Sequence, residues 1–487
     1  MNQCSPSLVE RPFQRLFSVS CMPANSTSAL LERLAGLLGD HLDDSKAANK
    51  PVVDYRPAAE LRERVDVSLG EEGRDWDELF QDIAAYLTHQ VRTAHPQFYN
   101  QLWSGVDVAG LLGDFTAAAT NTSMYTYEAA PLATLIELEL IRKCRELAGF
   151  PQGEGSFTTG GSNSNMLALM LARDRSLPDA RRHGLQHQPH PLCFFVSDQA
   201  HFSFDKAALT LGLGLDALVR VPSDEHGRME PAELDRLIEA SRAEGKQPFF
   251  VCATAGTTVL GAFDPLPPIA AVARKHGLWL HVDGSWGGSA LLSPNQRHRL
   301  AGLQEADSLA WNPHKLMNVS LPCALLLTRE PGLLEASCDT GNTEYLYHDY
   351  DSADYDLGKR SMHCGRQVFA FKLWLSWRQL GDRGYAQQMD HLVALAQATR
   401  ERIAAEPNLE LQAEPSFLNL CFRYRPADSR LNLNNFNKEL RQRLLRSGRA
   451  MVNYSYLKNG DLTIRLIIAN PESTEASLEE FVSAVLL

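Results

Sequence analysis

The stretch FFVCATAGTTVLGAFDPLPPIAAVARKHGLWLHVD (249–283) indicates the fold, because it has the pattern of a strand, a helix and a second strand in succession. Its two ends, residues 249–255 and 278–283, are almost wholly apolar, which is typical of parallel strands that are buried on both faces of a sheet. Between them, residues 265–276 have a helical pattern. Two similar apolar runs lie elsewhere in the chain, LCFFVS (192–197) and CALLLT (323–328). Strands and helices in alternation predict an α/β architecture.

The chain has 487 residues, which exceeds one ordinary hydrophobic core and predicts two or three domains. We expect an N-terminal segment over 1–94, in which helices span 30–42 and 76–94. A large α/β domain is expected over 95–365. A small α+β domain should follow over 366–487, with helices and strands as follows: helices at 367–380, 385–406, 434–447 and 476–487, and strands at 417–424 and 462–468.

Charge and hydropathy exclude several classes of partner. The 47 basic and 59 acidic residues give a formal net charge of −12, so nothing in the overall charge favours nucleic acid or an anionic membrane. No apolar run approaches the ~18–20 residues that span a bilayer. Glu10, Arg11 and Arg15 interrupt the N-terminal apolar stretch before it reaches the length of a signal peptide. We therefore expect a cytoplasmic protein whose nine scattered cysteines form no disulfides.

Residues 158–165 (TTGGSNSN) stand directly before the apolar helical run MLALMLA. Glycines permit close approach of the backbone, and a helix N-terminus presents free N–H groups, so this stretch suits an anion cradle. A glycine-rich turn with a Ser or Asn N-cap is the alternative. The familiar phosphate-loop patterns, GxxxxGK[ST] and GxGxxG between strand and helix, are absent from the sequence.

Two further positions carry chemistry. Asp283 ends an apolar strand, where α/β sheets bind ligands, and its carboxylate suits an N-cap, a metal or a protonated ring nitrogen. Lys315 follows in the run WNPHK (311–315), and an apolar setting would lower its pKa and free its amine as a nucleophile; an exposed turn lysine is the alternative. An anion cradle, a strand-end Asp and a Lys about thirty residues later form the layout of enzymes that use pyridoxal phosphate.

Longer stretches make the sequence recognisable. It resembles the pyridoxal-phosphate-dependent amino acid decarboxylases of the glutamate and cysteine sulfinate group over roughly residues 50–487. The matching stretches are HPQFYNQLWSG (95–105), NTSMYTYEAAP (121–131), GSFTTGGSNSNM (155–166), ATAGTTVLGAFDP (253–265), HVDGSWGGSALLS (281–293), ADSLAWNPHKLM (306–317), CGRQVFAFKLWLSW (364–377) and IRLIIANP (464–471). The resemblance implies pyridoxal-phosphate fold type I, in which a mostly parallel sheet forms the large domain. It also implies a homodimer with sites at the interface and an N-terminal segment that wraps the partner subunit.

By this resemblance, Lys315 binds the coenzyme covalently and Asp283 pairs with its ring nitrogen. His201 matches the histidine that stacks on the ring face and can assist catalysis, and Thr254 matches the residue near the ring hydroxyl. The phosphate contacts fall on four side chains: Ser162, Asn163, Ser308 and His314. The family usually has Ala-Ala after the aspartate, whereas this chain has Gly284 and Ser285, so Ser285 is expected to pack under the ring and to add a hydrogen bond or loosen the packing.

The resemblance also implies a substrate site. Arg465 matches the arginine that binds the α-carboxylate, with a purely structural arginine as the alternative. Asn100 and Gln101 match the segment that contacts the side-chain acid. The bulky Trp103 would shorten that pocket and favour cysteine sulfinate or aspartate over glutamate, unless Trp103 only packs in an interface. Because one methylene discriminates by only ~1–3 kcal/mol, mixed specificity is compatible with this pattern, and a glutamate decarboxylase is the alternative.

Tyr345 matches the tyrosine of a mobile loop that protonates the substrate carbon after decarboxylation, although Tyr347 and Tyr350 lie nearby. Family members with Phe at this position divert the reaction to oxygen, so Tyr345 favours simple decarboxylation over that reaction or transamination. A non-catalytic relative of the family is disfavoured because the key residues are all present. A metal site at three clustered histidines is also disfavoured, since they lie in a polar, proline-containing stretch: His183, His187 and His190.

Overall fold

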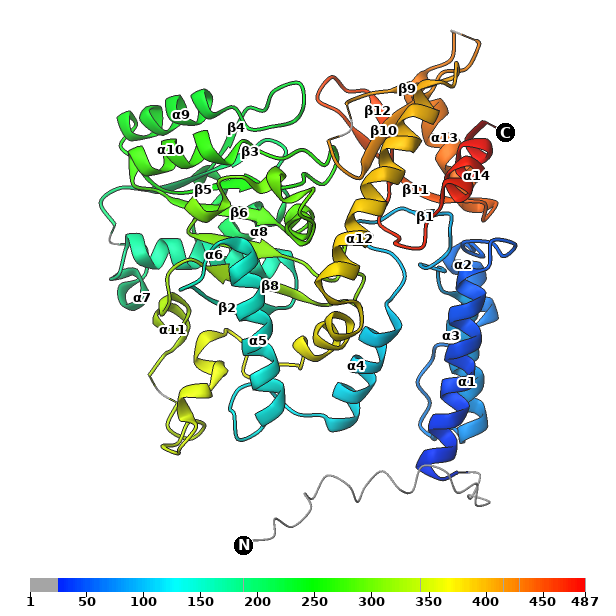
Figure 1. The fold of residues 1–487 in the computed structure, drawn as a ribbon, viewed down its shortest axis with the longest axis horizontal. Helices are drawn as coiled ribbons and strands as arrows, with labels where there is room; N and C mark the ends of the chain where they lie inside the picture. Colours follow the sequence, from blue (N-terminus) through cyan, green and yellow to red (C-terminus); the bar gives the residue numbers. More distant parts are fainter. Residues whose placement is uncertain (1–24, 187, 342, 415, 429, 487) are drawn as a thin grey trace, which may run out of the picture.

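The computed structural model describes residues 25–186, 188–341, 343–414, 416–428 and 430–486, and it contains two β-sheets that helices surround (Figure 1). The seven-stranded sheet belongs to the middle of the chain, and the five-stranded sheet belongs mainly to its C-terminal part. The long helix α12 (Ala370–Ala404) lies between them. This arrangement matches the α/β fold type I architecture that the sequence predicts.

The large sheet has the strand order β2-β8-β7-β6-β5-β3-β4. Its strands are β2 (Glu154–Thr158), β3 (Leu192–Ser197), β4 (Leu218–Val221), β5 (Gln247–Thr254), β6 (Trp279–Gly284), β7 (Ser308–Trp311) and β8 (Ala324–Thr328). The neighbours from β4 through β3, β5 and β6 to β7 are parallel, whereas β8 runs antiparallel to both β7 and β2. The prediction of a mostly parallel sheet is confirmed.

Both faces of this sheet are buried, as the apolar strand sequences predict. In β5, Val251 and Ala253 pack into one hydrophobic cluster, while Phe250 and Cys252 pack into another on the opposite face. The first cluster includes residues of α5 (Pro131–Ala148), α9 (Pro231–Ala243) and α10 (Leu266–His276); the second includes residues of α6 (Gly161–Ser176), α8 (Ser203–Thr210) and α11 (Leu333–Cys338). The short helix α7 (Ala180–His183) follows α6.

Short 3₁₀ helices occupy several connections around the large sheet. They lie at Leu215–Ala217, Gly287–Leu292, Arg297–Leu300, Leu303–Glu305, Ala353–Tyr355 and Leu357–Arg360.

The small sheet has the order β1-β11-β12-β10-β9. Its strands are β1 (Phe98–Tyr99), β9 (Leu409–Leu411), β10 (Asn419–Tyr424), β11 (Met451–Tyr456) and β12 (Leu462–Ile467), and helices α13 (Leu433–Arg446) and α14 (Glu475–Leu486) accompany them. Strand β1 pairs in parallel with β11, so the chain contributes to the small sheet before it builds the large one. The two-residue β1 therefore ties the predicted start of the large domain to the C-terminal part.

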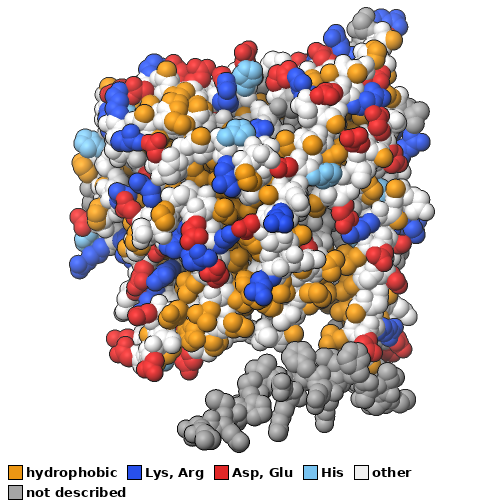
Figure 2. Space-filling view, in the orientation of Figure 1, with side chains coloured by type: hydrophobic (Ala, Val, Ile, Leu, Met, Phe, Trp, Pro, Cys, Tyr) orange, Lys and Arg blue, Asp and Glu red, His pale blue; other side chains and the backbone are white. Residues whose placement is uncertain are grey.

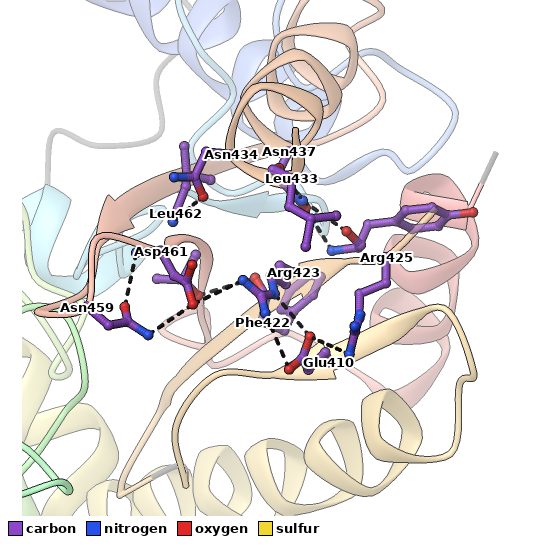
Figure 3. A network of polar contacts seen from close by, with 12 residues as sticks. Glu410, Phe422, Arg423, Arg425, Leu433, Asn434, Asn437, Asn459, Asp461 and Leu462 are labelled. Carbon is purple, nitrogen blue, oxygen red and sulfur yellow. Dashed lines mark hydrogen bonds and ion pairs between the residues drawn. The ribbon is translucent and has the colours of Figure 1, made fainter. Parts of the chain in front are cut away.

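A polar network holds the outer edge of the small sheet together (Figure 3). Arg423 on β10 contacts Glu410 on β9 at 3.0 Å and Asp461 before β12 at 3.1 Å. Asn434 on α13 accepts a hydrogen bond from the Leu462 N–H at 2.8 Å. Asn437 on α13 bonds both the N–H and the carbonyl of Tyr424. These contacts fix α13 against the strands.

Helix α12 connects the two halves of the molecule. The sequence predicts two helices, 367–380 and 385–406, and the structure has one element with a break at Gly381, whose φ of 64° and ψ of 179° are not helical. Residues of α12, including Leu373 before the break and Leu392 after it, are fully buried in the same cluster as strands of both sheets. The non-helical Gly381 therefore divides this element into two helices that meet at a kink, which confirms the two predicted helices.

The N-terminal helices are α1 (Thr27–Lys46), α2 (Ala58–Arg64) and α3 (Trp76–His89), followed after β1 by α4 (Val108–Thr120). A capping box starts α3: Asp75 accepts from the Glu78 N–H, and Glu78 accepts from the Asp75 N–H. Helix α3 ends at His89 rather than at residue 94, because Arg92 donates its N–H to the Val52 carbonyl and the chain turns away. In the described part of the chain, no helix is long and apolar enough to cross a membrane.

Candidate active site

A cavity of about 180 Å³ lies at the carboxyl ends of the central strands, where parallel sheets place their ligand sites. Thr254 ends β5, Asp283 lies near the end of β6, and Asn312 follows β7. The residues that line the cavity are Gly161, Ser162, Asn165, His201, Thr254, Gly256, Thr258, Asp283, Ser285, Trp286, Asn312 and Lys315. The structure therefore brings six predicted site residues together: Ser162, His201, Thr254, Asp283, Ser285 and Lys315.

Asp283 is 6% exposed and forms the floor of the cavity. Its Oδ1 accepts the Ser285 backbone N–H at 3.0 Å, and its Oδ2 accepts Nδ2 of Asn165 at 2.8 Å. Burial raises its pKa, but the hydrogen bond from Ser285, the charge of Lys315 and the bond from Asn165 together hold the pKa below its ordinary value. Asp283 is thus an ionised carboxylate, which suits a cationic partner in the cavity.

Lys315 lies in the turn after β7, where its N–H bonds the Asn312 carbonyl. Its amine is enclosed by protein, and this burial lowers the pKa to about 8, although Asp283 opposes the shift and Arg465 adds to it. At pH 7 a pKa of about 8 leaves roughly a tenth of the amine neutral, some 300-fold more than an ordinary lysine. The structure therefore gives Lys315 the nucleophilic character that its sequence neighbourhood predicts.

His201 follows β3 and begins the turn into α8. Its Nδ1 accepts the Ser203 backbone N–H at 3.2 Å, so the proton of the neutral ring is on Nε2. Burial lowers the pKa of His201, which keeps the ring uncharged at neutral pH. A neutral imidazole on the cavity wall can stack on a planar ligand and donate a hydrogen bond through Nε2.

The cavity wall contains polar atoms that lack a partner within the described residues. They are Oγ1 of Thr254, Oγ of Ser285 and Oδ1 of Asn312, and all three residues are buried. Gly161 comes so close that a Cβ there would lie 2.5 Å from Oγ of Ser285. Buried polar groups normally have partners, and here a ligand with several polar groups would supply them. The donors, the enclosed amine and the carboxylate fit pyridoxal phosphate.

Gly284 shows why this chain departs from the Ala-Ala pattern. A Cβ at Gly284 would lie 2.8 Å from Cδ1 of Leu309 and 3.1 Å from the Ala310 carbonyl oxygen. The neighbouring strand β7 thus occupies the space that an alanine methyl would need. Ser285 remains free to face the cavity.

Arg465 on β12 approaches the cavity from the small sheet. It is 8% exposed; its Nη1 donates to the carbonyl of Thr258, which lines the cavity, and its Nη2 donates to the Asn100 carbonyl at 3.4 Å. Nε of Arg465 and Oδ1 of Asn100 are buried and have no partner among the described residues. This pair offers one donor and one acceptor to a small ligand beside the cavity.

Three residues predicted to contact phosphate lie elsewhere. Asn163 is half-buried, and its Oδ1 is 3.4 Å from Nε2 of His363. Ser308 is the first residue of β7, at the end remote from the cavity, and its hydroxyl bonds Trp279 and His281. His314 is buried, and its Nδ1 lies 2.6 Å from the Cys323 carbonyl oxygen. None of the three lines the cavity; Asn312, four residues after Ser308, does.

The remaining predicted residues lie outside the cavity of this single chain. Tyr345 is 76% exposed in the segment before residue 357. Gln101 is half-buried after β1. Trp103 packs on Phe98 with ring centroids 5.8 Å apart, in a cluster with Val52 and Val53. Of the histidine group considered for a metal, His187 lies outside the described residues and His190 contacts the Gly245 carbonyl.

Six residues that line the cavity were not among the predicted site residues: Gly161, Asn165, Gly256, Thr258, Trp286 and Asn312. Asn165 lies in the predicted anion cradle TTGGSNSN and Asn312 in the run WNPHK, so the sequence indicates both stretches but not these two residues. Asn165 contacts Asp283 across 118 residues of sequence, and no local pattern reports such a pairing. Trp286 is 1% exposed and hydrogen-bonds Asn419 of the small sheet, which places it as a buried contact between the two halves.

Comparisons with known proteins agree with this geometry. A family model described as the pyridoxal-dependent decarboxylase conserved domain matches residues 57–425. The human cysteine sulfinic acid decarboxylase is 39% identical over 467 residues, which cover 93% of this chain and 94% of that protein. The Drosophila melanogaster glutamate decarboxylase is 37% identical, covering 96% and 94%.

Solved structures give the same result. The crystal structure of mouse CSAD has a TM-score of 0.91 with 38% identity and covers 94% of this chain and 97% of that chain. A Catharanthus roseus tryptophan decarboxylase in complex with L-tryptophan has a TM-score of 0.86 with 26% identity, covering 96% and 98%. The match over most of the chain, together with the enclosed lysine and the strand-end carboxylate, shows that the chain belongs to the pyridoxal-dependent decarboxylases, enzymes that remove a carboxyl group with the help of pyridoxal phosphate.

Proposed function

We propose that this enzyme decarboxylates a small acidic L-amino acid, cysteine sulfinate to hypotaurine or aspartate to β-alanine, with glutamate to 4-aminobutyrate as the alternative. The observation that carries the proposal is the convergence of Lys315, Asp283 and His201 on one cavity beside Arg465. Relatives named as cysteine sulfinic acid, acidic amino acid and glutamate decarboxylases, at 37–39% identity, support the acidic substrate class.

The coenzyme supplies an aldehyde that condenses with an amine and a ring that accepts the electron pair left when carbon dioxide departs. Lys315 would hold it through the nucleophilic amine, and the carboxylate of Asp283 would keep a protonated ring nitrogen charged. His201 would stack on the ring as a neutral imidazole. Thr254, Ser285, Ser162 and Asn312 would hold its polar groups.

Arg465 is the residue that we assign to the substrate α-carboxylate. Its side chain is fixed by two backbone carbonyls, those of Thr258 and Asn100, so its remaining donors face in a defined direction. A guanidinium held in this way can orient a carboxylate, which decides which bond of the substrate breaks. Asn100, whose carbonyl contacts Arg465, and the next residue, Gln101, are proposed to contact the side-chain acid.

Tyr345 is proposed to return a proton to the substrate carbon after decarboxylation. Its hydroxyl is exposed in the single chain, so this role requires that its segment closes on a site or reaches into that of a second copy. A phenol at this position favours the amine product. Aldehyde formation, the rival outcome, would indicate that the carbon is not protonated quickly enough.

A homodimer is the proposed working form. Large exposed apolar side chains occur on α4 and α5, and Figure 2 shows hydrophobic side chains gathering on the lower part of this face, where those helices lie in Figure 1. They are Val108, Leu112, Phe115, Leu132 and Leu135. The N-terminal helices also expose Leu31, Leu79 and Tyr86 and are proposed to wrap the partner. Light scattering should give twice the chain mass of 54.1 kDa, and a monomer would contradict this part of the proposal.

We propose a cytoplasmic location, since the acidic chain has no membrane-binding charge and its scattered cysteines suit a reducing compartment. Fractionation of cells that express the full chain with a fluorescent C-terminal fusion tests this, and enrichment in a membrane or organelle fraction would contradict it.

The deciding experiment for function is a substrate panel with product identification. The purified enzyme with added pyridoxal phosphate is given cysteine sulfinate, aspartate, glutamate, tryptophan and lysine, and carbon dioxide, amine and aldehyde are each measured. We expect amine from the acidic substrates, with cysteine sulfinate or aspartate used fastest. Preference for glutamate would select the alternative, and preference for an aromatic or basic amino acid would overturn the acidic class.

A further inference from the structure

A row of buried side chains leads from Asp283 by way of Asn165 back to His281 on the same strand and to Ser308 at the start of the neighbouring strand β7. Nδ2 of Asn165 lies 2.8 Å from Oδ2 of Asp283, and Oδ1 of the same amide lies 3.1 Å from Nε2 of His281. Nδ1 of His281 lies 2.8 Å from Oγ of Ser308, and that hydroxyl lies 2.8 Å from Nε1 of Trp279. Three successive hydrogen bonds thus separate the carboxylate from Ser308, which the family resemblance had assigned to phosphate.

The direction of every bond in this row is fixed by its two ends. The indole of Trp279 can only donate, so the Ser308 oxygen accepts from it, and the hydroxyl hydrogen remains available to donate to Nδ1 of His281 once the other end of the row places the imidazole proton on Nε2. The ionised carboxylate of Asp283 can only accept, so it receives Nδ2 of Asn165, and Oδ1 of Asn165 must then accept Nε2–H of His281. All the donors point toward Asp283.

His281 is well suited to this position. It is fully buried, and the rings of Phe250 and Phe204 pack on it at centroid distances of 5.8 and 6.4 Å. Burial lowers its pKa to about 4, against the opposing charge of Asp283, so the ring is neutral and holds one proton. Ser308 keeps that proton on Nε2. A proton on Nδ1 instead would leave Asn165 without its donor.

We propose that Ser308, His281 and Asn165 form a positioning relay that holds the carboxylate of Asp283 in the orientation needed to pair with the coenzyme ring. This inference deepens the proposed function and rests on it for the identity of the ring partner. His281 and Ser308 touch neither the cavity nor a ligand in it, so they act through Asn165. Without the donor from His281, Asn165 is held only through its Nδ2, which donates to Asp283 and to Oγ of Ser203, so the amide and the carboxylate that it holds can shift together.

The chain contains a matched control for Ser308. Oγ of Ser289 accepts Nε1–H of Trp311 at 2.9 Å, just as Oγ of Ser308 accepts that of Trp279, and both serines are 0% exposed. Ser289 contacts no histidine in the hydrogen bonds of the described residues. Ser308→Ala and Ser289→Ala therefore each leave one buried indole donor without a partner, but only the first interrupts the relay.

With the coenzyme bound, Ser308→Ala should lower kcat about tenfold with little change in KM and should shift the pH dependence of the coenzyme absorbance. Ser289→Ala should lower the melting temperature by a similar amount and change kcat less than about twofold. Ser308→Thr, which keeps the hydroxyl, should restore both readouts. Equal effects of the two Ala variants, or an unchanged absorbance profile in Ser308→Ala, would overturn the relay.

A second readout needs neither activity nor coenzyme. In apoprotein labelled with ¹⁵N-histidine, the His281 signals, assigned by their loss in His281→Gln, should show a neutral ring with the proton on Nε2 from about pH 6 to about pH 8. Ser308→Ala should populate the Nδ1–H form, and Ser289→Ala should not. A His281 that titrates near pH 6.5, or that carries its proton on Nδ1, overturns the relay even if decarboxylation is confirmed. The expected tautomer in a protein that decarboxylates none of the acids would overturn only the proposed function.

Discussion

The floor of the cavity and the segment that carries Tyr345 are built in opposite ways. At the floor, both oxygens of Asp283 are hydrogen-bonded, one to the backbone of Ser285 and one to Asn165, and the carboxylate is 6% exposed. Around residue 345, the backbone N–H groups of Leu346 and Tyr347 donate to the Thr343 carbonyl, and the Tyr345 side chain is 76% exposed. The carboxylate of Asp283 is thus fixed by hydrogen bonds at both oxygens, whereas the segment around Tyr345 is stabilised by a local turn.

This difference separates two tasks of the enzyme. Holding charge next to a coenzyme needs groups that do not reorganise during the reaction, and burial among fixed hydrogen bonds provides this. Delivering a proton to a carbon needs a group that arrives after the substrate has entered. Substitutions in the floor should therefore affect every step, and substitutions near Tyr345 should affect only the fate of the product.

The largest effect is expected for Lys315→Ala, which removes the nucleophilic amine at the floor. Turnover should fall by at least about 10³-fold. Borohydride reduction followed by peptide mapping should place the coenzyme on Lys315 in the wild type and on no lysine in the variant. Lys372→Ala is the control, because Lys372 is also buried, at 2% exposure, but pairs with Asp114. It should lower stability and still allow labelling of Lys315; a label on another lysine in the wild type would refute the assignment.

Asp283→Asn should come next, with a loss of about 10²–10³-fold in kcat and a smaller loss of coenzyme affinity. The charge of Asp283 raises the pKa of Lys315, which burial holds at about 8. Without that charge the ammonium form is less favoured, so the pKa should fall further. Capture of coenzyme by the apoprotein requires the neutral amine and should rise with pH through about 8 in the wild type, and through a lower pH in the variant. Comparable losses in rate and affinity would make Asp283 mainly a binding group.

Tyr345→Phe tests the other region. Amine formation should fall by about 10²-fold, because the proton donor is lost, and part of the product should become aldehyde. Coenzyme binding and melting temperature should stay as in the wild type, since the Tyr345 side chain is mostly exposed. Tyr355→Phe, a 44% exposed phenol nearby, is the control and should leave the product unchanged. If Tyr355→Phe rather than Tyr345→Phe altered the product, the proton donor would have been misassigned.

The smallest effect is expected for Trp103→Leu. If Trp103 shortens the substrate pocket, the ratio of kcat/KM for glutamate to that for cysteine sulfinate should rise about tenfold. If Trp103 only packs on Phe98, both values should fall together and the ratio should stay constant. Leu431→Ala, at a 45% exposed apolar position that belongs neither to the site nor to the proposed dimer surface, shows how much a general apolar truncation changes the two rates.

Local sequence patterns predict much of the fold and the residues at the floor of the cavity. The apolar runs that end at Thr254 and Asp283 are strands β5 and β6, and their buried parallel pairing follows from composition alone. Lys315 and His201 stand beside recognisable runs. Each of these residues is placed by the strand that precedes it, so a local pattern is enough to find it.

The contacts that sequence missed depend on register and on distant segments. Strand pairing sets Ser308 opposite His281, two residues before Asp283, which places the Ser308 hydroxyl below the cavity and Asn312 at its rim. A shift of pairing by a few residues would exchange their roles, and nothing in the run ADSLAWNPHK specifies the register. The location of Trp103 and Tyr345 relative to a bound substrate likewise depends on contacts with segments that are distant in the sequence.

The pairing of β1 with β11 has a consequence for biosynthesis. Phe98 lies opposite Met451, so 451 minus 98, or 353 residues, must leave the ribosome before this strand finds its neighbour. At about 5–20 residues per second, translation takes on the order of 20–70 s over that distance. Gln97 likewise donates to the Ser477 carbonyl 380 residues away. A fragment that starts at residue 366 would lack this edge strand. During translation, the large domain must form while β1, at its N-terminal end, is still unpaired, because β11 has not yet been synthesised.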